Sequence, residues 1–90
     1  MAKIGLLTAE ALSEHCLTYL AEHPGELAEF MVATGTTPDG LRRAVASGDI
    51  MHGLIDYVAQ NESLLLAICT SAGIAPESFM RVWAKLNPAG

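Results

Sequence analysis

Glycine and proline residues divide this chain into six stretches, each the length of a short helix. A proline ring clashes with the preceding turn of a helix, and glycine favours the left-handed conformation that follows a helix end. Between these breaks, apolar residues recur every three or four positions, as on one helix face, and no alternating strand pattern occurs. The sequence therefore predicts an all-α chain, a compact six-helix bundle with helices at about residues 9–22, 24–33, 38–47, 50–60, 64–72 and 76–86.

Capping residues support these boundaries. Thr8 and Thr37 each precede a predicted helix and carry the hydroxyl that satisfies free backbone N–H groups at a helix start. Gly35, Gly48 and Gly73 follow predicted helix ends, where the left-handed conformation is common.

The apolar positions predict which face of each helix is buried. The stretch 64–69 is hydrophobic on most sides, so we expect the fifth helix to lie at the centre. In the other helices the expected inward residues are Leu12, Cys16, Tyr19 and Leu20; Leu27, Phe30, Met31 and Thr34; Leu41, Ala44 and Val45; Met51, Leu54, Ile55 and Val58; and Phe79, Val82, Trp83 and Leu86.

The two halves of the chain align with each other at a shift of 38 residues. Seven identities fall in the 36 aligned positions from residue 12 to residue 47, among them Gly35 with Gly73 and Pro38 with Pro76. The alignment predicts two related three-helix halves, although any six-helix chain can be slid onto itself by matching leucines. Tyr19 and Tyr57 are equivalent in this alignment and would form a symmetric pair or lie at the edge of the core.

Length and composition indicate one domain spanning residues 1–90. It is expected to comprise an apolar arm (1–7), two halves (8–48 and 49–87) and a short tail (88–90). Hydrophobic residues make up 51% of the chain and charged residues 17%, which excludes a disordered chain.

No apolar run approaches the roughly 20 residues of a membrane span. Two cysteines are too few for a disulfide scaffold, and the N-terminus lacks the pattern of a signal peptide, so we expect a cytoplasmic protein.

The net charge of −5 argues against nucleic acid as a partner. Four of the five basic residues lie on the third and sixth predicted helices, and they form the candidate partner-binding set: Arg42, Arg43, Arg81 and Lys85. The alternative is a solvated surface on which Asp39 pairs with Arg43 and Glu77 with Arg81. The acids gather elsewhere, because the first thirty residues contain Glu10, Glu14, Glu22, Glu26 and Glu29 and one lysine.

No pattern indicates catalysis, a metal centre or a cofactor. His52 and Asp56 are one helical turn apart, but two ligands are too few for a zinc site. Cys16 lies on a predicted buried face, where a thiol is a poor nucleophile. We therefore expect a protein that is not an enzyme and holds no metal.

Two Gly-x-x-Pro-Asp/Glu turns, at residues 35–39 and 73–77, occur together with Leu27, Phe30, Tyr57 and the leucine-rich stretch 64–69. In these features the chain resembles, over residues 9–87, a family of bacterial proteins classed as domain of unknown function 3572. The resemblance implies a compact all-helical cytoplasmic protein and supplies no catalytic residue.

These observations favour a non-enzymatic interaction or regulatory module that binds an unidentified protein or a second copy of itself. Binding would use the basic residues, the acidic N-terminal helices or apolar residues outside the core. An alternative is a small-molecule binder with a pocket between the halves, lined by Tyr19, Tyr57 or methionines. An enzyme or a nucleic-acid binder is less favoured. Trp83 is expected to pack in the core, and its exposure would instead indicate a docking surface.

Overall fold

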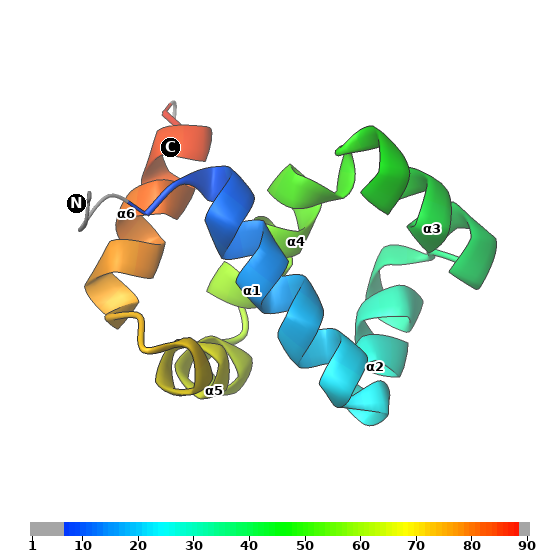
Figure 1. The fold of residues 1–90 in the computed structure, drawn as a ribbon, viewed down its shortest axis with the longest axis horizontal. Helices are drawn as coiled ribbons and strands as arrows, with labels where there is room; N and C mark the ends of the chain where they lie inside the picture. The colour runs from blue at the N-terminus through cyan, green and yellow to red at the C-terminus, as the bar shows by residue number, and fades with distance from the viewer. Residues whose placement is uncertain (1–6, 89–90) are drawn as a thin grey trace.

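The computed structural model describes residues 7–88, and six helices without strands make up that range (Figure 1). The helices are α1 (Ala9–Glu22), α2 (Pro24–Thr34), α3 (Pro38–Ser47), α4 (Ile50–Ala59), α5 (Glu62–Ala72) and α6 (Pro76–Leu86). The predicted all-α bundle is confirmed, and α1, α3 and α6 begin and end where the sequence indicated.

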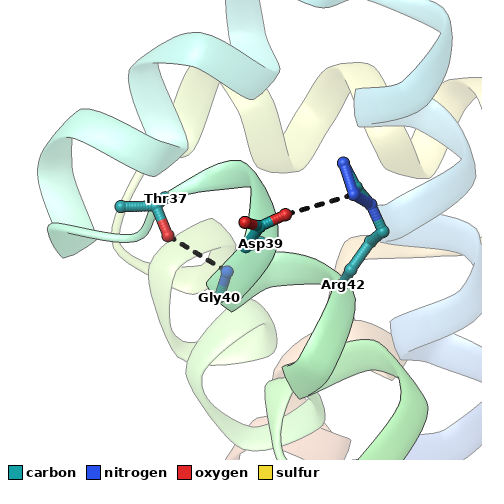
Figure 2. Close-up of polar contacts among 4 residues, drawn as sticks. All are labelled: Thr37, Asp39, Gly40 and Arg42. Atoms are coloured by element: carbon teal, nitrogen blue, oxygen red, sulfur yellow. Dashed lines mark hydrogen bonds and ion pairs between the residues drawn. The ribbon is translucent and has the colours of Figure 1, made fainter.

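The predicted capping residues are in place. The Thr8 and Thr37 hydroxyls each accept a hydrogen bond from the backbone N–H three residues later, at 3.1 and 3.0 Å (Figure 2 shows Thr37). Gly35, Gly48 and Gly73 end α2, α3 and α5 with φ angles of 70°, 81° and 70°. Residues other than glycine rarely adopt this left-handed backbone conformation, so each glycine ends its helix sharply.

The core lies between α1 and α4 and is completed by α5 and α6. α4 packs against α1, α3, α5 and α6, and α1 packs against α2, α4, α5 and α6. The buried residues form one cluster: Leu12, Cys16, Leu20, Phe30, Leu54, Ile55, Val58, Leu64, Leu65, Ile68, Cys69, Phe79 and Val82. All the residues that were expected to face inward on α1, α4 and α6 belong to this cluster or pack against it.

The expectation that the fifth helix lies at the centre is wrong. Successive helical residues point about 100° apart, so a run of leucines cannot all face one core. Leu64 and Leu65 are buried, whereas Leu66 is 45% exposed. α1 and α4 have the larger number of helical neighbours and occupy the centre instead.

The inward face predicted for the third helix is also wrong in part. α3 contains no buried residue, and Val45 is 42% exposed. Leu41 and Ala44 are only half-buried. The physical reason is that α3 has one main neighbour, α4, which covers one side of it. In α2, similarly, Phe30 alone is buried and Thr34 is exposed.

The structure does not confirm the internal repeat. α3 and α6 are equivalent in the alignment, yet α6 packs against α1, α4 and α5 while α3 packs mainly against α4. The equivalent tyrosines also differ, because Tyr19 stacks on His23 with ring centroids 3.9 Å apart, and Tyr57 and Phe30 form a T-shaped pair with ring centroids 5.0 Å apart. The duplication therefore stays a prediction.

The predicted N-terminal arm and tail lie mostly outside the described residues. Leu7, at the end of the arm, is half-buried against the core, and Pro88 is exposed. Within residues 7–88 no single helix is long and apolar enough to cross a membrane. α5 and α6 pass that test only as a pair bent by 116°, a test that buried core helices also pass.

Candidate functional site

A groove of about 460 Å³ lies between the first half of α1 and the junction of α3 with α4. Its apolar lining consists of Leu17, Ile50 and Met51, all half-buried, together with the exposed Val45. On the α1 side the lining ends in exposed acidic residues and a serine: Glu10, Glu14 and Ser13. The groove therefore has an apolar floor beside two carboxylates.

Local structure explains why these side chains meet. Glu10, Glu14 and Leu17 are spaced by four and three residues, so they share one face of α1. Across the groove, Gly48 ends α3 in the left-handed conformation and turns the chain directly into α4. This tight turn places Val45 of α3 and the first residues of α4 on the same side of the groove.

The four basic candidate residues do not form one strip. Arg42 and Arg43 lie on α3 and Arg81 and Lys85 on α6, at opposite ends of a molecule 37 Å long (Figure 1). All four side chains are exposed.

Within the part of the chain that the structure describes, the one ion pair joins Arg42 to Asp39 at 3.4 Å (Figure 2). Asp39 therefore pairs with the residue three positions on, rather than with Arg43, which is four positions on. Both partners are highly exposed, so the pair contributes little to stability.

Asp56 links α4 to α6 through a hydrogen bond. Its carboxylate accepts hydrogen bonds from Trp83 Nε1 at 2.9 Å and from Gln60 Nε2 at 3.0 Å. His52 is exposed. Trp83 is half-buried and packs against the core, which is close to its predicted role. No group of three potential metal ligands occurs among residues 7–88.

The two cysteines are buried, and burial disfavours their thiolate forms. Burial raises the pKa of the Cys16 thiol to about 12, with a further contribution from Cys69, and burial also raises the pKa of Cys69. Both thiols are free and stay protonated at neutral pH, so neither is a ready nucleophile.

The structure has two further hollows with lining residues from both predicted halves, although Thr34 is the one residue of the first half in the larger of them. A shallow one of about 650 Å³ has a largely polar lining that includes Asp56, Tyr57 and Glu62. A smaller, partly open one of about 200 Å³ lies between α2, α3 and α4, and its lining includes Phe30 and Leu54. Sequence reasoning expected such a pocket near Tyr57, but it did not anticipate the smaller cavity, because it placed the apolar face of α3 in the core.

Sequence reasoning also missed the groove as a unit. It noted the acidic residues of α1, but it assigned Val45 and Met51 to the core. The signal that was present is the amphipathic face of α3, where Leu41, Ala44 and Val45 lie among small and charged residues.

The fold and the groove define a small all-helical protein with an acidic and apolar surface groove. The chain belongs to the family described as Protein of unknown function (DUF3572), whose model matches residues 7–89. This confirms the resemblance seen in the Gly-x-x-Pro turns. No curated protein and no solved structure matches the chain significantly.

Proposed function

We propose that this protein is a non-enzymatic interaction module that binds a basic amphipathic helix of a partner protein in the groove between α1 and the α3–α4 junction. The observation that supports it most is the pairing of an apolar floor, with Val45 exposed in it, and the carboxylates of Glu10 and Glu14. A helix that docks in a groove presents apolar anchors on one face, and its flanking charges select the partner.

Charge favours a basic segment over an acidic one. The chain has a net charge of −5, and the groove lining contains two carboxylates and no basic side chain. An acidic partner would instead use Arg42 and Arg43 on α3 or Arg81 and Lys85 on α6, which offer two small separate clusters. The predicted role of these basic residues is therefore the weaker of the two interaction hypotheses.

The proposal is tested with a leucine–lysine peptide of about 18 residues, long enough to form an amphipathic helix. We expect saturable binding by isothermal titration calorimetry, weakened about tenfold by the double variant Glu10→Gln/Glu14→Gln. Val45→Lys should abolish binding, whereas Val32→Lys, at an 84% exposed position on α2, should have no effect. Equal binding of a peptide with the same composition in shuffled order would contradict the proposal.

The natural partner is identified by photo-cross-linking in the source cell. A benzophenone amino acid at position 45 should capture a basic amphipathic segment, and the same amino acid at position 32 should not. Capture of an acidic segment at position 45 would overturn the proposal.

A further inference from the structure

The partly open cavity between α2, α3 and α4 combines an apolar floor with a polar edge. Phe30 and Leu54 are 3% and 0% exposed, and half-buried Leu41 and Ile50 extend the apolar lining. Thr36 and Asp49 are among the polar side chains of the lining. Its volume of about 200 Å³ suits one aromatic ring or branched alkyl group with a short substituent.

α3 forms one wall of the cavity through Leu41 and Ala44. This helix buries no side chain completely and has one main neighbour, so it can shift without opening the core between α1 and α4. A ligand in the cavity would cover the half-exposed apolar side of Leu41 and Ala44, which the protein itself leaves incompletely packed.

The hydrogen bonds at the polar edge of the cavity indicate which kind of group a ligand must present there. The Thr34 hydroxyl donates to the Phe30 carbonyl oxygen at 2.8 Å, so in its 2.8 Å contact with Thr36 the Thr36 hydroxyl must be the donor. Because its one hydroxyl hydrogen is used in that bond, the Thr36 oxygen can only accept a hydrogen bond from a ligand. Asp49 makes no side-chain cap on α4, and its carboxylate also accepts.

We propose that this cavity binds a small aromatic or branched aliphatic primary amine. The apolar group lies against Phe30 and Leu54, and the ammonium donates to Asp49 and Thr36. Asp49 is the one charged residue in the lining, and the net charge of −5 favours a cation further. Arg43 lines a neighbouring surface hollow with Asp49 and not this cavity.

The probe is phenethylamine, and the matched control is 3-phenylpropionate, which has a similar ring and chain but the opposite charge. In an NMR titration of the full chain we expect saturable shifts of the Leu41, Ile50 and Leu54 methyl groups with a Kd of about 1 mM or tighter. The acid should bind at least about tenfold more weakly. Asp49→Asn should remove most of this difference.

Ala44→Leu adds a larger side chain to the lining and should abolish binding of the amine. Ala28→Leu, at an exposed position of α2, is the matched control and should bind as the wild type does. If Ala44→Leu fails to fold, intermolecular NOEs between the probe's ring and the Leu54 methyl groups of the wild type decide the question. Non-saturating shifts, equal binding of amine and acid, or NOEs to another surface would overturn the proposal. Val45→Lys should leave amine binding intact, so failure of the cavity proposal is distinguishable from failure of the groove proposal.

Discussion

At the scale of single residues, the hydrogen bond from Trp83 to Asp56 is a contact between distant parts of the chain, which the spacing of residues along one helix cannot predict. The two residues are 27 positions apart, and nothing in the spacing of either helix indicates that they meet. Sequence spacing instead suggested Asp56 with His52, one turn away on α4. The structure places Asp56 against α6, so its carboxylate helps to hold two helices together.

The buried thiol of Cys16 makes stability depend on alkaline pH. Its pKa is raised from 9.0 to about 12 in the folded protein, so the fold favours the neutral thiol. This contribution is fully present below pH 9 and is lost as pH rises from 9 towards 12, because the unfolded thiol ionises first. We expect the free energy of unfolding to fall by up to about 2 kcal/mol between pH 8 and pH 10.5 from this group.

Urea denaturation at several pH values checks this prediction. The Cys16→Ala variant, although less stable at pH 8, should lose less stability over the same range. The two proteins share every other titratable group, so the difference between wild type and variant isolates the Cys16 thiol. Identical slopes for the two proteins would contradict the prediction.

At the scale of helices, the chain shows which features local sequence determines. Gly35, Gly48 and Gly73, with the threonine caps, define helix ends by backbone conformation and short-range hydrogen bonds, so the boundaries could be predicted. Burial could not be predicted as well, because it depends on which helices meet. The amphipathic face of α3 looked like a core face, but only α4 covers it.

The weak packing of α3 predicts local opening. We expect its amide protons to exchange in native-state hydrogen exchange with an opening free energy at least about 2 kcal/mol below that of α1 and α4. α6, its counterpart in the alignment, is the internal comparison because it buries Phe79 and Val82. Protection of α3 equal to that of α6 would show that α3 is held more firmly than its contacts indicate. Phenethylamine should raise the protection of α3 if the cavity binds it.

At the scale of the whole molecule, charge is divided between surfaces rather than spread evenly. Glu10 and Glu14 of α1 line the groove, while Arg42 and Arg43 on α3 and Arg81 and Lys85 on α6 form two groups at opposite ends of the long axis (Figure 1). The sequence indicated that acids and bases are separated along the chain, but it could not show that α3 and α6 are apart. The fold therefore keeps the acidic residues of the groove together on one surface and separates the four basic residues into two distant groups.

This arrangement predicts that salt weakens binding of the leucine–lysine peptide. Raising sodium chloride from about 50 to 500 mM shortens the Debye length to a few ångströms and should reduce affinity about tenfold. The double variant Glu10→Gln/Glu14→Gln should show a much smaller dependence. An affinity that does not change with salt would mean that apolar contacts alone hold the peptide.

Trp83 is the one tryptophan in the chain, and its indole N–H on α6 donates a hydrogen bond to Asp56 on α4. Its fluorescence is thus an intrinsic optical reporter for one end of the molecule. The emission of Trp83 should change when α6 separates from α4 and should stay nearly constant when α3 opens at the other end. A fluorescence-monitored unfolding curve would then describe the tightly packed part of the protein, and the loosely held helix beside both proposed binding sites needs a separate label.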